Sequence, residues 1–139
     1  MSMFSIFGIS GSAVSAQSQR LNVVASNLAN ADATAGPDGQ AYKARQVVFQ
    51  TVAMDANAGA GAAGVRVDAV TENQTPGRRV HEPGHPFADP QGFVAYPGVD
   101  PAAEMVTLMA AMRSYEANLA ALNTARMMAL RTLDIGRGS

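Results

Sequence analysis

The chain has 139 residues, a formal net charge of −1 and no cysteine. This length is usual for a single domain, and the lack of thiols excludes a disulfide framework and a thiolate metal site. Charged residues make up only 15% of the sequence. Because no basic patch stands out, nucleic-acid binding has no electrostatic footprint. No run approaches the roughly 20 apolar residues that span a bilayer, so direct membrane insertion is not expected.

The first residues lack the pattern of a cleaved signal peptide. The apolar stretch at residues 3–9 is short, Ser5 and Gly8 interrupt it, and the first basic residue is Arg20. A cleavable signal carries its positive charge before a longer apolar stretch. The sequence therefore predicts either a protein that stays in the cytosol or one that leaves by a route that does not read such a signal.

An amphipathic helix is predicted near the amino terminus, strongest over residues 12–30. Val14, Leu21 and Leu28 recur every seven residues, with Val24 between them. That spacing is typical of helices that pack lengthwise against other helices. A cluster of turn-forming residues at 32–39 is expected to end the helix.

The middle of the chain contains most of the sequence signals for strands and turns. All seven prolines lie between Pro37 and Pro101, where they break helices. Strands are predicted at 43–52 and 65–68, with shorter β segments around Val80 and 93–96. The alanine- and glycine-rich run at 55–64 is predicted to be a flexible loop. These segments together predict a small, irregular β unit.

A second long helix is predicted from Pro101 to about Ile135. Asp100 suits the cap position, Pro101 suits the first helical position, and Gly136 suits the end. Apolar residues follow at spacings of three and four; they are Met105, Leu108, Met112, Tyr115, Leu119 and Leu122. This stripe again indicates lengthwise packing against helices.

The predicted fold is mainly α with a small β unit. The two terminal helices are expected to form a coiled-coil-like hairpin, with residues 1–31 and 99–139 as one discontinuous domain. Residues 32–98 are expected to form a second, β-rich domain. Because that small unit cannot cover both helices, apolar helix faces remain exposed, and such faces usually mark interaction surfaces.

Several asparagines lie on the predicted helices, and two interpretations of them remain open. One is that they face solvent, with Asn30 capping the helix end. The other is that a buried asparagine sets the register of the helical seam at some cost in stability. The residues predicted to pack helices or subunits together are Val14, Leu21, Val24, Asn27, Leu28, Asn30, Met105, Leu108, Met112, Tyr115, Asn118, Leu119 and Leu122.

The pentapeptide from His81 to His85 matches the letters of a zinc-protease motif, with Glu104 as a third possible ligand. That motif works only on a helix, which places both histidines on one face. Pro83 and Gly84 lie inside the pentapeptide, so a turn is expected instead. A metal-dependent hydrolase built on these three residues is the rival function, but no catalytic, metal or cofactor site is predicted.

Several segments resemble the bacterial flagellar axial proteins, the family of rod, hook and junction subunits. The run LNVVASNLANA at 21–31 is similar to their amino-terminal signature, and RSYEAN at 113–118 with NTA at 123–125 is similar to their carboxyl-terminal one. The middle segments narrow the resemblance to the proximal rod. They are GPDG at 36–39, YKARQVVF at 42–49, PGHP at 83–86 and GFVAYP at 92–97.

The resemblance implies a structural, non-enzymatic subunit of the proximal rod. Such subunits leave the cell through the flagellar type III export apparatus without a cleaved signal. They stack helically in the periplasm with copies of themselves and other rod proteins, and the rod transmits motor torque to the hook. A helical secretion-system component outside the flagellum shares the helix pattern but does not require the middle motifs.

Overall fold

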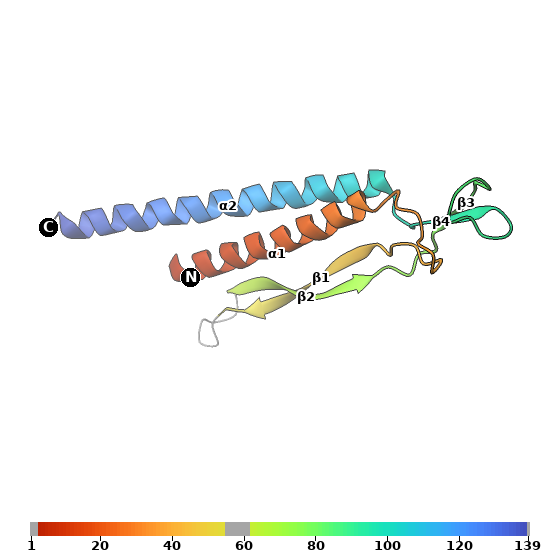
Figure 1. Cartoon of the computed structure of the whole chain (residues 1–139). Coiled ribbons are helices and arrows are strands. Elements are labelled where there is room, and N and C mark those ends of the chain that lie inside the picture. Colours follow the sequence, from red (N-terminus) through yellow and green to blue (C-terminus); the bar gives the residue numbers. More distant parts are fainter. Residues whose placement is uncertain (1–2, 55–61, 139) are drawn as a thin grey trace. The chain divides into compact units, whose positions relative to one another are not determined.

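The computed structural model describes residues 3–54 and 62–138. In chain order the elements are α1 (Met3–Ala29), β1 (Arg45–Ala53), β2 (Ala63–Glu72), β3 (Arg78–His81), β4 (Phe93–Tyr96) and α2 (Pro101–Arg137) (Figure 1). Over the described residues, β1 pairs with β2 and β3 pairs with β4 in two separate two-stranded sheets. The prediction of a mainly α chain with a small β component is confirmed.

Helix α1 begins earlier than the strongest part of its sequence signal, because two glycines near its start do not interrupt it. A Cβ atom added to Gly8 would lie 3.7 Å from Met54 Sδ, and one added to Gly11 would lie 4.0 Å from Leu122 Cδ1. A Cβ atom at either position would therefore make only an ordinary van der Waals contact. The packing of the whole helix against other elements offsets the roughly 1 kcal/mol that each glycine costs a helix relative to alanine.

Helix α2 has 37 residues, which corresponds to about 55 Å at 1.5 Å per residue. Its predicted start is confirmed, since Asp100 Oδ1 accepts hydrogen bonds from the amides of Ala102 (3.0 Å) and Ala103 (3.4 Å). The helix ends at Arg137, close to the predicted end at about Ile135, but the prediction that Gly136 terminates it is wrong. Gly136 has no positive φ, so it continues the helix to Arg137 rather than ending it in the left-handed conformation.

Strands β1 and β2 are longer or shifted relative to their predictions of 43–52 and 65–68. Residues 55–61 of the predicted loop at 55–64 lie outside the described residues. Residues 63 and 64 of that loop belong to β2, so the loop prediction is wrong for these two residues. Gly64 is buried because β2 starts against α1. A Cβ atom there would lie 1.8 Å from Met54 Cε, and the next amide, of Val65, donates to Ser12 Oγ (3.1 Å).

The contacts among residues divide the chain into two compact units. The first unit contains Met1–Gln19, Val48–Ala69 and Ala110–Ser139, and the second unit contains Arg20–Val47 and Val70–Met109. Each unit thus takes part of both helices and part of both long strands. The sequence-based division separates the two helices (residues 1–31 with 99–139) from the middle segment (residues 32–98). It stays a prediction.

Small side chains make up most of the buried core. In the first unit the buried residues include Ser10, Ala16, Ala111 and Ala125, and in the second unit they include Val24, Ala31, Ala35, Ala44 and Val94. Small residues allow backbones to approach closely, because the distance between packed helices depends on the size of the side chains at the contact. The sequence-based list did not include the alanines, although Ala111, Asn118 and Ala125 recur every seven residues.

In the second unit, β3 and β4 form a short antiparallel hairpin. Its register pairs Arg78 with Tyr96 and His81 with Phe93. The Arg78 guanidinium lies 5.1 Å from the centre of the Tyr96 ring, and that of Arg79 lies 5.0 Å from the Phe93 ring. These cation–π contacts between neighbouring strands stabilise the hairpin. The β segments predicted around Val80 and at 93–96 are confirmed.

The loop that joins β3 to β4 is organised by Asp89, and this makes hairpin stability dependent on pH. The pKa of Asp89 lies below its ordinary value of 3.8, chiefly because the Phe93 amide donates to its carboxylate, with further help from the Gln91 amide and Arg79 and against an opposing effect of burial. A lowered folded pKa stabilises the fold above the unfolded pKa, and this contribution disappears as the pH falls through the folded pKa.

We therefore expect NMR titration of the full chain to give an Asp89 carboxyl midpoint below 3.8. Asp89→Asn should remove this component of the acid dependence, because the amide cannot ionise. A midpoint at or above the ordinary value would contradict the assignment.

Candidate assembly surface

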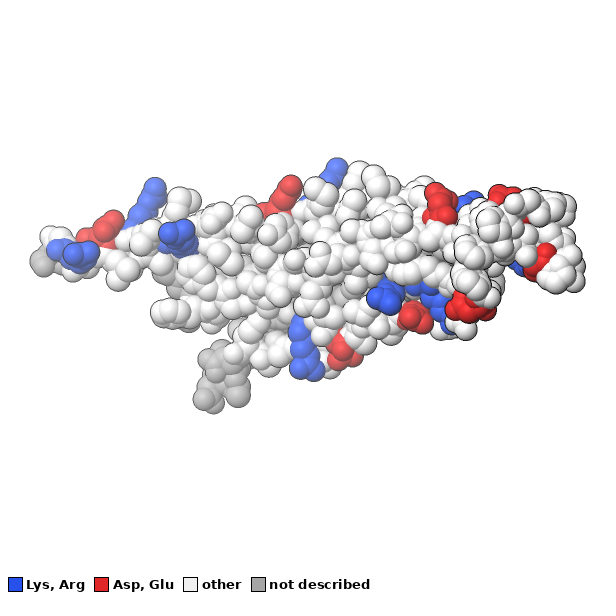
Figure 2. All heavy atoms as spheres, viewed as in Figure 1, with Lys and Arg blue, Asp and Glu red and all other residues white. Residues whose placement is uncertain are grey.

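Helix α2 exposes many large apolar side chains within the first unit. We call this set the α2 apolar surface; it consists of Met112, Leu119, Met127, Met128, Leu130, Leu133 and Ile135. On the face shown in Figure 2, charged side chains are few and scattered over α2 among uncharged ones. Large apolar side chains exposed in this number on one helix indicate an interaction surface. Over their described residues, neither helix combines the length and the hydropathy needed to cross a bilayer.

The last turns of α2 extend beyond the described start of α1 within the first unit (Figure 1). Gly11 of α1 lies beside Leu122 of α2. From there α1 extends about 12 Å to Met3, whereas α2 extends about 22 Å to Arg137. Leu133 and Ile135 on this extension are 63% and 78% exposed. The carboxyl-terminal end of the α2 apolar surface is therefore its most exposed part.

A different kind of site lies in the second unit, where Asn27 is the centre of a buried hydrogen-bond cluster. Asn27 is only 1% exposed. Its Nδ2 donates to the Arg45 carbonyl (2.8 Å) and to Glu104 Oε2 (3.2 Å). Its Oδ1 accepts from Tyr42 Oη (2.9 Å) and from the Arg45 amide (2.9 Å). All the hydrogen-bonding capacity of the amide is used, so its orientation is fixed. We call these four residues the Asn27 cluster.

The thirteen residues predicted to pack helices or subunits together differ in burial. Val24 and Asn27 are buried, and Met105, Met112 and Leu119 are exposed. The remaining residues are half-buried; they are Val14, Leu21, Leu28, Asn30, Leu108, Tyr115, Asn118 and Leu122. The predicted stripe therefore contains both side chains that pack inside the chain and side chains that remain available to another molecule.

The three residues of the rival hydrolase lie in different surroundings in the second unit. His81 ends β3 and its ring packs edge-on to Phe93 at 5.0 Å. His85 lies in a turn, as predicted, where its Nδ1 accepts from the Phe87 amide (3.1 Å). Glu104 accepts from Asn27. Among residues 3–54 and 62–138, no group of three or more histidine, aspartate or glutamate side chains is arranged to hold a metal ion.

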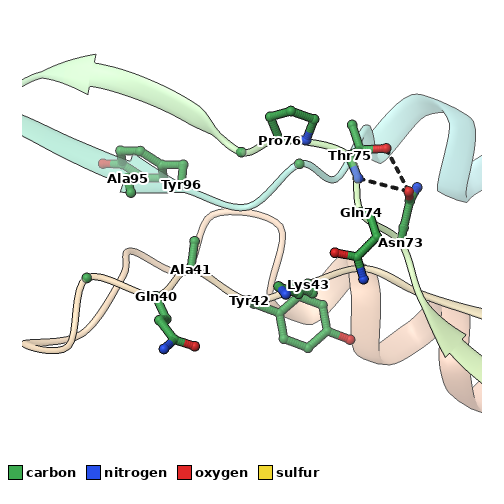
Figure 3. A pocket seen from close by; sticks show the side chains of 13 residues that line it. Gln40, Ala41, Tyr42, Lys43, Asn73, Gln74, Thr75, Pro76, Ala95 and Tyr96 are labelled. Atoms are coloured by element: carbon green, nitrogen blue, oxygen red, sulfur yellow. Dashed lines mark hydrogen bonds between the residues drawn. The ribbon is translucent and has the colours of Figure 1, made fainter.

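The second unit also contains an open cavity of about 490 Å³ between three irregular segments. Figure 3 shows Gln40, Tyr42, Gln74 and Tyr96 among the side chains around it, and Asn73 bonded to Thr75. The residues that line it include no aspartate, glutamate or histidine that could act as a catalytic acid or base. We therefore assign no chemistry to this cavity.

Two family models match the ends of the chain, which are the segments that form the helices. The model described as flagella basal body rod protein matches residues 8–37, and the model described as flagellar basal body rod FlgEFG protein C-terminal matches residues 91–135. The exposed apolar helix and the absence of a catalytic constellation among the described residues agree with a class of structural flagellar proteins.

Curated relatives match nearly the whole chain. The flagellar basal-body rod protein FlgC of Escherichia coli O6:H1 is 55% identical, and that of Salmonella typhimurium is 54% identical, in each case over 99% of this chain and all of the relative. FlgC of Bacillus subtilis is 36% identical with the same coverage. The chain therefore belongs to the FlgC family of flagellar basal-body rod proteins, which are structural proteins and not enzymes.

Proposed function

We propose that the chain is a structural subunit of the proximal rod of the flagellar basal body. It assembles helically with copies of itself and with other rod proteins, and the assembled rod transmits motor torque to the hook. The observation that carries the proposal is the α2 apolar surface, whose side chains are exposed in the single chain. A subunit of a helical assembly needs such a surface, because every copy must bury apolar area against its neighbours.

In the assembled rod, the terminal helices act as a coiled-coil-like hairpin. Residues 1–31 and 99–139 form this layer, and residues 32–98 form a separate outer domain. The thirteen helix residues described above pack within and between subunits. Supporting this assignment, Met105, Met112 and Leu119 belong to the predicted stripe and are exposed in the single chain.

The energetics of assembly follow from the same surface. Each apolar side chain that a neighbouring subunit covers contributes about 1.5–3 kcal/mol. Several such side chains per subunit offset the entropy lost when the helix ends become ordered. A rod that resists torque then depends on many moderate interfaces rather than on one strong contact.

We further propose that the chain reaches this position through the flagellar type III export apparatus, without a cleaved signal, and that it assembles in the periplasmic space. It requires no cofactor and binds no nucleic acid. Family membership and the low net charge of −1 support this part of the proposal.

The proposal is tested by deleting the gene in the bacterium that encodes the chain. We expect the deletion to abolish swimming, a plasmid copy to restore it, and the chain to copurify with basal bodies isolated from the restored cells. An empty plasmid is the control. Normal swimming after deletion, or basal bodies that lack the chain, would refute a role in the rod.

A further inference from the structure

The Asn27 cluster connects three segments that are far apart in the sequence. Asn27 lies on α1, Arg45 begins β1, and Glu104 lies in the first turn of α2. Arg45 contributes both its amide and its carbonyl, so the beginning of the strand is held by one side chain of the helix. Tyr42 is held by the same amide and also lies 3.3 Å from Ser26 Oγ.

The surrounding apolar contacts define the alignment of these segments less sharply. Val24 precedes Asn27 on the buried face of α1, and the buried Ala31 follows it in the turn after the helix. Apolar burial is non-directional and depends mainly on area, so a slip of one helical turn, about 5.4 Å, would exchange one apolar contact for another. The same slip would break every bond to Asn27, because hydrogen bonds require distances near 3 Å and good alignment.

A slipped arrangement would also leave polar groups unpaired. The buried Asn27 amide would lose its partners, and so would the part-buried amide and carbonyl of Arg45. Each unpaired buried polar group is costly. A single buried asparagine is known to set register in coiled coils by the same physical effect. In this chain the partners of the asparagine are a strand and a carboxylate rather than a second asparagine.

We propose that Asn27 is a register lock, which fixes where the start of β1 and the start of α2 dock on α1 and makes the two dockings interdependent. Glu104 is the α2 side of the lock, and the backbone of Arg45 is the strand side. The lock acts within one chain, so the inference does not depend on the proposed role in the rod.

The test uses the full-length protein and exploits its lack of cysteine. Spin labels on cysteines introduced at the exposed positions Ala25 and Ala103 report the alignment of α1 with α2. Amide hydrogen exchange at Arg45 reports the strand side. In Asn27→Ala we expect exchange at Arg45 to accelerate by at least about tenfold, as loss of buried hydrogen bonds implies, and the spin-label distance distribution to broaden.

A second variant separates a lock from a general loss of folding. Glu104→Ala removes only the α2 side, so we expect a broadened distance distribution while exchange at Arg45 changes less than in Asn27→Ala. Glu104→Gln keeps an acceptor oxygen and should restore the narrow distribution. The control is Asn22→Ala, an exposed asparagine on the same helix. The proposal is overturned if Asn27→Ala or Glu104→Ala leaves the distribution narrow, or if Asn22→Ala broadens it equally.

Discussion

Replacing Leu133 by aspartate is expected to leave the isolated chain folded and to prevent its incorporation into basal bodies. Leu133 is 63% exposed, so the substitution should change the free energy of unfolding of the single chain by no more than about 0.5 kcal/mol. In an interface between subunits, the same carboxylate would be buried without a partner, which costs several kcal/mol. Thermal unfolding followed by circular dichroism, swimming in soft agar and immunoblots of purified basal bodies measure the two effects separately.

The matched control for this variant is Leu133→Ala, which shortens the same exposed side chain without introducing a charge. We expect clearly weaker loss of swimming than with Leu133→Asp. Normal swimming of the Leu133→Asp strain would show that the end of the α2 apolar surface does not contact a neighbour.

Replacing Gly77 by alanine is expected to destabilise the second unit strongly. A Cβ atom at Gly77 would lie 2.1 Å from the carbonyl oxygen of Tyr96, and the obstacle is backbone that cannot rotate away. The segments before β3 and after β4 would have to separate, at a cost of about 2–3 kcal/mol. Urea unfolding of the full chain, followed by tyrosine fluorescence, measures the change.

Gly84→Ala is the control, because a Cβ atom at Gly84 would have no atom within 4 Å. It should be neutral or stabilise the chain by up to about 1 kcal/mol, since alanine restricts the unfolded chain. Equal unfolding midpoints for Gly77→Ala and the parent chain would show that the two segments are not packed as described.

Local sequence signals predicted the elements best. Asp100 and Pro101 carry their helix-start signal within a few residues, and the start of α2 is where they predict it. The small-residue core was harder to predict. Ala111 and Ala125 are among the most buried residues, yet alanine occurs equally well on exposed helix faces, so only the packing of a second element distinguishes them.

The candidate sites were predictable to different depths. Met112 and Leu119 belong to an apolar stripe that the sequence spacing predicts. Their exposure in the structure agrees with an interaction surface. Asn27 was a candidate from its residue type, but its bonding partners were not predictable. Arg45 and Glu104 lie 18 and 77 residues further along the chain, and hydrogen bonds over such separations leave no periodic signal.

The methionines of the α2 apolar surface make this surface sensitive to oxidation. Met112, Met127 and Met128 are exposed, and oxidation of methionine to the sulfoxide turns a flexible apolar side chain into a polar one. Exposed methionines are oxidised before covered ones. In an assembled chain, neighbouring subunits would cover these methionines and keep them reduced, whereas peroxide would oxidise them in an unassembled chain. Oxidation would therefore damage chains that remain unassembled for a long time. Chains already in a completed rod would keep their apolar interfaces.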